Sequence, residues 1–176
     1  MQIPPNAKIL LDKKTIEKRL DEVASELRGF LLESGEGEFE IVWLAEGARV
    51  FAEAILSRIG VKIKAVPVKV SSYQNGLESS GEAKIFGGLE GVKSRRVLLV
   101  DDILDTGLTA KTVIEKLREM GAEEIKTCFF LNKLSKNGGE PRADFSCFEI
   151  PDKFVFGCGL DYMGRFRELE DLMFVE

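Results

Sequence analysis

The segment 95–109, RRVLLVDDILDTGLT, restricts the fold of this chain more than any other, because it joins an apolar run to three carboxylates and a helix. Its four consecutive apolar residues are typical of a strand that is buried on both faces of a sheet. We expect this strand at 95–100 and the helix at 109–121. The helix has one apolar face, formed by Ala110, Val113, Ile114 and Leu117. The segment therefore predicts a βα unit with Asp101 and Asp102 at the end of the strand.

The same alternation of strand and helix runs through most of the chain. Asp12 is placed to cap a helix whose apolar residues recur at helical spacing as far as Leu31, and Gly47 opens a second helix that ends at Gly60. Strands are expected at 39–44, 62–70 and 125–131, and a strand with a turn at 83–91. Strands that alternate with helices predict an α/β fold, with a mostly parallel central sheet flanked by helices. The length of 176 residues favours one domain.

Three segments depart from this regular pattern. Pro67 predicts that the strand at 62–70 is an edge strand or is irregular, because proline has no N–H to donate to a neighbouring strand. The segment 71–82, SSYQNGLESSGE, is rich in polar, turn-forming residues, and so long a loop in a compact domain is often functional. The tail at 132–176 has two short strand candidates, FVFG and LMFV, among loops.

The chain contains no histidine, which excludes several classes of catalytic site. Ser-His-Asp and Cys-His catalysis need an imidazole, as do histidine-ligated zinc and iron sites. Acid–base chemistry is therefore left to Asp, Glu, Lys, Tyr or Cys. The net charge of −5 and the pI near 5.1 argue against a nucleic-acid partner, which would require a basic face.

The apolar runs and the cysteines of the sequence indicate in which cellular compartment the protein is expected. No apolar run approaches the roughly 18 residues of a membrane span, and the segment 1–14 lacks the apolar core of a signal peptide. Cys128, Cys147 and Cys158 are an odd number without C-x-x-C spacing, so a disulfide framework is not expected. We expect a cytoplasmic protein with no membrane partner.

Asp101, Asp102 and the segment 105–109, DTGLT, lie where open α/β sheets bind ligands, at the carboxyl end of a strand and the N-terminus of a helix. The N–H and hydroxyl groups after Asp105 suit a phosphate, and Gly107 allows close backbone approach. The paired carboxylates instead suit a vicinal diol, such as that of ribose, or a magnesium ion. Together these features favour a sugar phosphate.

Two alternatives follow from the same residues. The segment could be a solvated acidic loop that only caps the helix through Thr109. It could also be an acidic magnesium pocket like that of response-regulator receivers. The second alternative needs a phosphate-accepting Asp at another strand end, and the sequence shows none.

VLLVDDILDTGLT (97–109) resembles the phosphoribosyl-pyrophosphate (PRPP) motif of the type I phosphoribosyltransferases. SSYQNGLESSGEAKI and FEIPDKFVFGCGLDYMGRFREL resemble the mobile loop and the purine-binding region of the hypoxanthine/guanine members. The resemblance implies the type I phosphoribosyltransferase fold, a single domain over 1–176. Its core would span about 12–131, and the N-terminal segment (about 1–11) and the C-terminal segment (about 132–176) would form a small hood.

The resemblance also implies roles for individual residues on the PRPP side. Asp101 and Asp102 would hold the ribose hydroxyls. The 5′-phosphate would be bound by Asp105, Thr106, Gly107, Leu108 and Thr109. Asp105 would also be the general base or acid near N7 of the purine, in agreement with the absence of histidine.

Further roles concern the base, the pyrophosphate and the metal. Lys133 would recognise the 6-oxo group, Phe154 would stack on the base, and the backbone of Val155 would contact its edge. The pyrophosphate and the closing loop would involve Glu46, Gly47, Ser72, Tyr73 and Arg167. Mg²⁺ would be held by Asp161, which also adjoins the base, together with Asp101 and Asp102.

One site departs from the family pattern. The family usually has Leu-Lys-Gly after the first core strand, with an unusual cis peptide beside the pyrophosphate, whereas this chain has Ala45-Glu46-Gly47. Gly47 is retained, but the charge is reversed. Glu46 could turn away from the pyrophosphate, for example toward Arg49, or stay and take part in hydrating or holding the metal. We expect the first of these.

The implied activity is Mg²⁺-dependent transfer of 5-phosphoribose from PRPP to N9 of hypoxanthine or guanine, which forms IMP or GMP and releases pyrophosphate. The resemblance also implies a homodimer or a homotetramer. The alternative is a PRPP-sensing regulatory protein of the same fold that binds nucleic acid. Such a regulator would favour a basic face or an added DNA-binding domain, and the acidic chain shows neither.

Overall fold

The computed structural model describes residues 2–35, 38–72, 83–133 and 141–176, with the side chains of 71 and 72 left out. The order of its elements is β1 (Ala7–Leu11), α1 (Lys13–Ser34), β2 (Phe39–Ala45), α2 (Arg49–Ile59), β3 (Ala65–Ser72), β4 (Ala83–Gly87), the 3₁₀ turn η1 (Leu89–Gly91), β5 (Arg96–Leu104), α3 (Leu108–Glu119), β6 (Glu124–Asn132), β7 (Phe145–Glu149), β8 (Phe154–Phe156) and β9 (Leu172–Val175).

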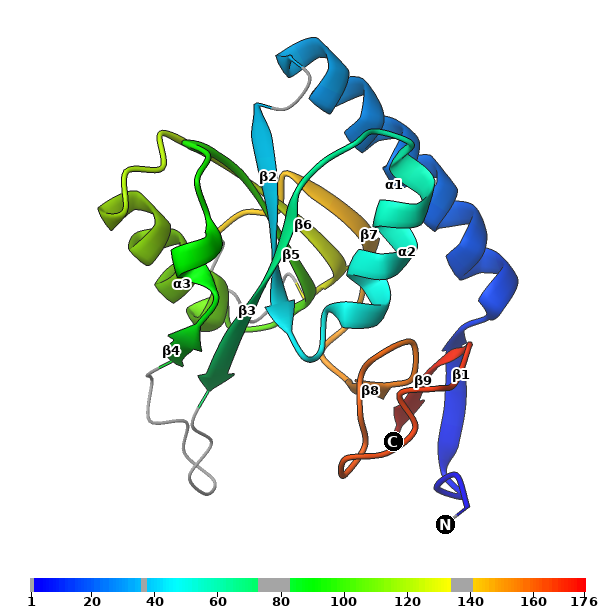
Figure 1. Ribbon diagram of the computed structural model, residues 1–176. Helices are drawn as coiled ribbons and strands as arrows, with labels where there is room; N and C mark the ends of the chain where they lie inside the picture. Colours follow the sequence, from blue (N-terminus) through cyan, green and yellow to red (C-terminus); the bar gives the residue numbers. More distant parts are fainter. Residues whose placement is uncertain (1, 36–37, 73–82, 134–140) are drawn as a thin grey trace.

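A central sheet of six strands organises the fold, in the order β4-β3-β2-β5-β6-β7. All neighbouring strands are parallel except β3 and β4. Helices α1 and α2 lie on one side of this sheet and α3 on the other (Figure 1). The predicted α/β fold, a mostly parallel sheet flanked by helices, is confirmed.

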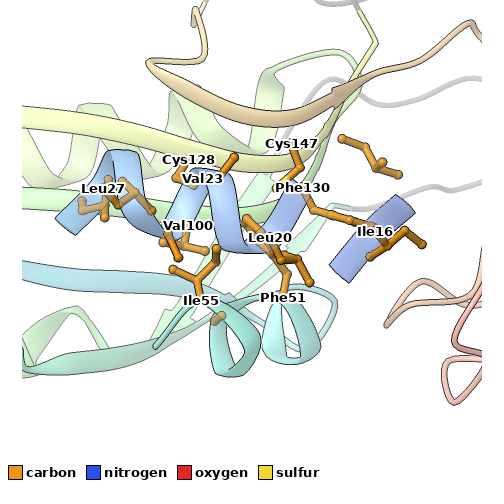
Figure 2. Packing of buried hydrophobic residues seen from close by; sticks show 14 of the residues in the cluster. Ile16, Leu20, Val23, Leu27, Phe51, Ile55, Val100, Cys128, Phe130 and Cys147 are labelled. Atoms are coloured by element: carbon orange, nitrogen blue, oxygen red, sulfur yellow. The ribbon is translucent and has the colours of Figure 1, made fainter. Parts of the chain in front are cut away.

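The two faces of the central sheet carry two separate hydrophobic cores, because successive side chains of a strand point to opposite faces. In β5, Leu98 and Val100 belong to the core under α1 and α2, whereas Val97 and Leu99 belong to the core under α3. Figure 2 shows the first core, where Leu20, Val23 and Leu27 of α1 meet Phe51, Ile55, Val100, Cys128 and Phe130. Strand β5 is therefore buried on both sides, as its apolar run predicted.

Helix α1 has the ends that its sequence predicted. The Asp12 carboxylate accepts a hydrogen bond from the Thr15 N–H at 2.7 Å, and Gly35 follows the last residue of the helix. The side chains that α1 buries are Ile16, Leu20, Val23, Ala24, Leu27 and Leu31. This apolar stripe holds the helix on the sheet, since isolated helices are marginal in water.

The predicted end of β5 at Val100 is wrong. The strand continues through Asp101 and Asp102 to Leu104, because β6 extends alongside it and pairs Leu104 with Asn132. Tertiary pairing thus overrides the low strand propensity of aspartate. The two carboxylates lie inside the strand, just before its carboxyl end.

Three more details differ from the sequence-based expectation. Strand β3 is an interior strand, but its ladder with β4 begins only at Lys69, so Pro67 lies outside that ladder. Pro67 itself lies in a regular ladder with β2, opposite Trp43, and the irregularity of β3 is a register shift against β4 between Lys69 and Val70. Strands β1 and β7 were not predicted, because each has only five residues and lies at an edge or against a partner at the other end of the chain.

A second sheet of three antiparallel strands, β1-β9-β8, joins the N-terminal and C-terminal segments. Lys8 forms an ion pair with Glu176 at 2.8 Å across this sheet. Figure 1 shows it beyond the end of the central sheet toward which β2 and β3 point. The small sheet therefore stands beside the carboxyl ends of the parallel strands.

Among the described residues, no helix is both long and apolar enough to cross a membrane.

Candidate active site

The centre of the site is the carboxylate pair at the end of β5. Asp101 is only 7% exposed, Asp102 is half-buried, and the Asp102 N–H donates to Asp101 Oδ1 at 2.9 Å. Burial raises the pKa of Asp101 well above its ordinary value, and the charge of Asp102 raises it further. Burial also raises the pKa of Asp102, although hydrogen bonds and the charge of Arg167 act in the opposite direction. Hydroxyl donors or a cation would stabilise this pair.

The loop that follows β2 lies directly against the carboxylate pair. A Cβ atom added to Gly47 would lie 2.0 Å from Oδ2 of Asp102, so only glycine fits at this position. The peptide bond between Ala45 and Glu46 is cis. The loop therefore brings its backbone, rather than a side chain, up to Asp102.

The side chain of Glu46 is exposed at the edge of this loop. Arg49 forms an ion pair with Glu53 at 3.9 Å, one helical turn further along α2. The expectation that Glu46 turns away from the pyrophosphate stays a prediction. Within the part of the chain that the structure describes, no ion pair joins Glu46 to Arg49.

The segment 105–109 forms the turn between β5 and α3. Gly107 adopts a left-handed backbone conformation with φ of 78° and occupies the N-cap position, so it offers no side chain to cap the helix. Thr109 lies inside α3, and the alternative in which it caps the helix is therefore wrong. The Thr106 hydroxyl accepts a long hydrogen bond from the Leu108 N–H at 3.4 Å. The turn thus presents backbone donors at a helix N-terminus, where an anion is favoured.

Lys133 follows β6 and is 5% exposed. Its N–H donates to the carbonyl of Leu104 at 2.9 Å, which fixes it beside the end of β5. The Nζ atom lies 3.1 Å from Asp105 Oδ2 and 3.7 Å from Asp152 Oδ1. The structure therefore brings together the two predicted residues Lys133 and Asp105, and it adds Asp152, which sequence reasoning missed. An acidic residue in a polar turn carries no local signal that it faces a buried lysine.

The C-terminal segment contributes an exposed aromatic ring. Phe154 is 54% exposed, and the edge-to-face contact with Tyr162, at 5.7 Å and 83°, holds its ring. Val155 and Phe156 are buried below it. An exposed ring supported from one side suits stacking on a planar ligand.

Arg167 and Gly159 order the C-terminal segment and its contact with the loop after β2. Its guanidinium donates to Asp161 Oδ1 and to the Gly159 carbonyl, both at 2.6 Å. Asp161 Oδ2 also accepts from the Gly164 N–H at 2.7 Å. A Cβ on Gly159 would lie 3.2 Å from the carbonyl oxygen of Gly47, so this segment packs tightly on the loop after β2.

The remaining site residues and the metal are described only in part. Ser72 is the last residue of β3, with no description of its side chain, and Tyr73 lies outside the described residues. Within the described ranges, no cluster of three or more carboxylate or cysteine groups is arranged to hold a metal ion by itself. A hard divalent cation would need oxygens from a ligand in addition to Asp101 and Asp102.

The chain matches the family described as "Phosphoribosyl transferase domain" over residues 6–163. It therefore belongs to the phosphoribosyltransferase family, and the resemblance found in the segment 97–109 is confirmed.

Two relatives resemble the chain over most of its length. The hypoxanthine-guanine phosphoribosyltransferase of Aquifex aeolicus (strain VF5) is 38% identical over 170 residues, which cover 96% of this chain and 94% of the relative. The enzyme of the same name from Bacillus subtilis (strain 168) is 35% identical, with coverage of 92% and 89%.

Two solved structures share the fold. A hypoxanthine phosphoribosyltransferase from Staphylococcus aureus superimposes with a TM-score of 0.83 at 28% identity, covering 96% of this chain and 91% of that one. The Trypanosoma cruzi hypoxanthine phosphoribosyltransferase in complex with its product IMP gives a TM-score of 0.82 at 26% identity, covering 100% and 98%.

The contact between Gly47 and Asp102 predicts that Gly47→Ala lowers the free energy of unfolding by roughly 1–3 kcal/mol, because the added methyl must displace the carboxylate. Urea denaturation measures the change. Gly29→Ala is the matched control, since nothing lies within 4 Å of its added Cβ, and it should stabilise α1 by up to about 1 kcal/mol. A Gly47→Ala variant as stable as the wild type would mean that Asp102 moves aside without cost.

Proposed function

We propose that this protein is a purine salvage enzyme, a hypoxanthine-guanine phosphoribosyltransferase. It would transfer 5-phosphoribose from PRPP to N9 of hypoxanthine or guanine, with formation of IMP or GMP and release of pyrophosphate. The observation that carries the proposal is the contact of 3.1 Å between Lys133 and Asp105, beside the carboxylate pair of β5. It brings a donor for a 6-oxo group next to a candidate acid–base residue. The similarity to enzymes of this name supports the same activity.

The parts of PRPP divide among elements that meet at the carboxyl ends of the strands. Asp101 and Asp102 would accept hydrogen bonds from the ribose 2′ and 3′ hydroxyls, which relieves the repulsion in this buried pair. The segment 105–109 would bind the 5′-phosphate through its N–H and hydroxyl groups, including those of Thr106 and Thr109. The pyrophosphate would lie at Gly47 and Arg167, whose planar guanidinium suits phosphate oxygens.

The base would lie between Lys133 and Phe154. Lys133 would donate to the 6-oxo group, Phe154 would stack on the ring, and the Val155 backbone would contact the edge of the base. Asp105 would exchange a proton with N7 as the glycosidic bond forms. We assign Ser72 and Tyr73 to a loop that closes over the site, because water would otherwise hydrolyse the oxocarbenium-like transition state.

We propose Mg²⁺ as the cofactor. The carboxylate pair fits it, because burial raises the pKa of both members, the charge of Asp102 raises the pKa of Asp101 further, and a divalent cation would favour their ionised form. Asp161 would join the metal site while it still accepts from Arg167, since each carboxylate oxygen has a second lone pair. When bound, the cation would offset the charge of the pyrophosphate that leaves.

Other properties of the protein remain predictions. A cytoplasmic location agrees with the free thiols of Cys128, Cys147 and Cys158. We also propose that the chain forms a homodimer or a homotetramer. The regulatory alternative gains no support, since the two relatives described above are both named as enzymes.

A panel of bases tests the proposed function. With PRPP and Mg²⁺, hypoxanthine or guanine should form its nucleotide, and adenine should not, because Lys133 would then meet an amino donor instead of an oxygen. A mismatch that leaves buried polar groups unpaired can discriminate by roughly 10⁴-fold. Xanthine and uracil complete the panel, with nucleotide formation followed by chromatography. Efficient turnover of adenine while hypoxanthine stays inert would refute the proposal.

The role of Asp105 predicts a second result. Asp105→Asn should lower kcat by about 10²–10⁴-fold, the usual contribution of a positioned acid or base, and should change the affinity for PRPP far less. Steady-state kinetics and PRPP titration measure the two effects. The control is Glu149→Gln, which removes an exposed charge at the end of β7. If kcat of Asp105→Asn equalled that of the wild type, Asp105 would serve only the structure of the turn.

The third prediction concerns Glu46. Glu46→Lys should strengthen the binding of PRPP and of pyrophosphate by several-fold up to about tenfold, because it replaces repulsion of the phosphates with attraction. Activity should survive, since the candidate catalytic residues are unchanged. Both affinities are measured across a Mg²⁺ titration, with Glu53→Lys on α2 as the control for net charge. Weaker binding and a higher requirement for Mg²⁺ would instead make Glu46 part of the metal site.

A further inference from the structure

The buried ammonium of Lys133 lies between two carboxylates, Asp105 in the turn before α3 and Asp152 in the turn before β8. We propose that Asp152 is a positioning residue, which holds Lys133 in place for the 6-oxo group of the purine. The inference rests on the proposed function and extends it to a residue that had no role there.

The Nζ atom of Lys133 interacts differently with the two carboxylates. The separation from Asp105, 3.1 Å, is that of a hydrogen bond, whereas the separation from Asp152, 3.7 Å, is that of an ion pair without a direct hydrogen bond. An ammonium has three N–H donors. Asp152 therefore attracts the charge of Lys133 without occupying a donor, which leaves donors for a ligand.

The position of Asp152 connects the two halves of the base site. Its turn is anchored to β6, because the Ile150 N–H donates to the Asn132 carbonyl at 3.0 Å. Phe154, the exposed aromatic residue, comes two positions after Asp152. The ion pair between Asp152 and Lys133 thus joins the turn before β8, the strand of Phe154, to the lysine that would hold the other edge of the base.

Asp152 also keeps a negative charge beside Lys133 when Asp105 is protonated. If Asp105 takes up a proton during the reaction, it becomes neutral, and Lys133 would lose its partner at 3.1 Å. A buried charge without a partner is costly. Asp152 keeps a negative charge next to the ammonium throughout, so Lys133 stays charged and directed at the base.

The main competing explanation is that Asp152 only stabilises its turn. Asp152 is 44% exposed, and exposed ion pairs contribute little to stability. The two explanations differ in one respect. A residue that acts through Lys133 has no effect on ligand binding once Lys133 is gone, whereas a residue that shapes the turn acts with or without the lysine.

A double-mutant cycle separates these explanations, with the dissociation constant of IMP measured by calorimetry. Asp152→Asn keeps the shape and removes the charge, and it should weaken IMP binding by about fivefold in the wild-type background. In the Lys133→Met background the same change should cost less than about twofold. Steady-state kinetics should show a higher KM for hypoxanthine with an unchanged KM for PRPP.

Three further measurements complete the test. Asp152→Glu should restore most of the lost affinity, a result that does not depend on how well Lys133→Met folds. Glu149→Gln, the same loss of charge three positions earlier, should leave the IMP affinity unchanged. An equal loss in both backgrounds, or no loss in either, would overturn this inference while the proposed function stands. Wild-type protein that neither binds IMP nor converts hypoxanthine would overturn both.

Discussion

The burial of two adjacent carboxylates in the central strand is the constraint on which the rest of the site depends. Asp101 and Asp102 lie in β5, which has strands on either side and helices over both faces. Such a pair is unfavourable without compensation, and the structure places groups around it that reduce the cost. Gly47 leaves room for the Asp102 carboxylate, and the charge of Arg167 acts on the same group. The loop after β2 and the C-terminal segment are thus arranged around one concentration of negative charge.

The two candidate ligand-binding cations of the site are also held by carboxylates. Among the described residues, Lys133 is paired with Asp105 and Asp152, and Arg167 is paired with Asp161. Each cation is therefore directed by a carboxylate before any substrate arrives. Preorganised donors of this kind cost little reorganisation when charge develops in a transition state, and this is usually a large contribution to catalysis.

Much of the fold could be predicted, because its main elements carry local signals. The cap at Asp12, the helical spacing up to Leu31 and the glycine after α1 specify that helix without reference to the rest of the chain. The end of β5 could not be predicted in this way. Aspartate disfavours strands, and only the pairing with β6 extends the strand through Asp101. Strand β1 was missed because it forms only against β9, near the other end of the chain. Strand β7 is a five-residue edge strand that pairs only with β6.

The candidate site also has one part that local sequence signals predict and one part that depends on the three-dimensional fold. The residues from 101 to 109 are contiguous, so a motif could identify them together. Asp152 and the contact between Gly47 and Asp102 exist only in three dimensions, since they depend on how two turns approach β5 and β6. The roles of the site residues remain predictions, whereas their positions are now described.

The small sheet ties the two ends of the chain to the centre of the molecule. Its strands β1 and β9 come from opposite ends of the chain, and the ion pair between Lys8 and Glu176 joins residues 168 positions apart. Val155 of β8 and Leu172 and Phe174 of β9 belong to the same buried core as Leu98 and Val100 of β5. The strand that carries Phe154 is therefore packed, through one continuous core, against the strand that carries the carboxylate pair, so the spacing between the aromatic ring and the carboxylates depends on both ends of the chain.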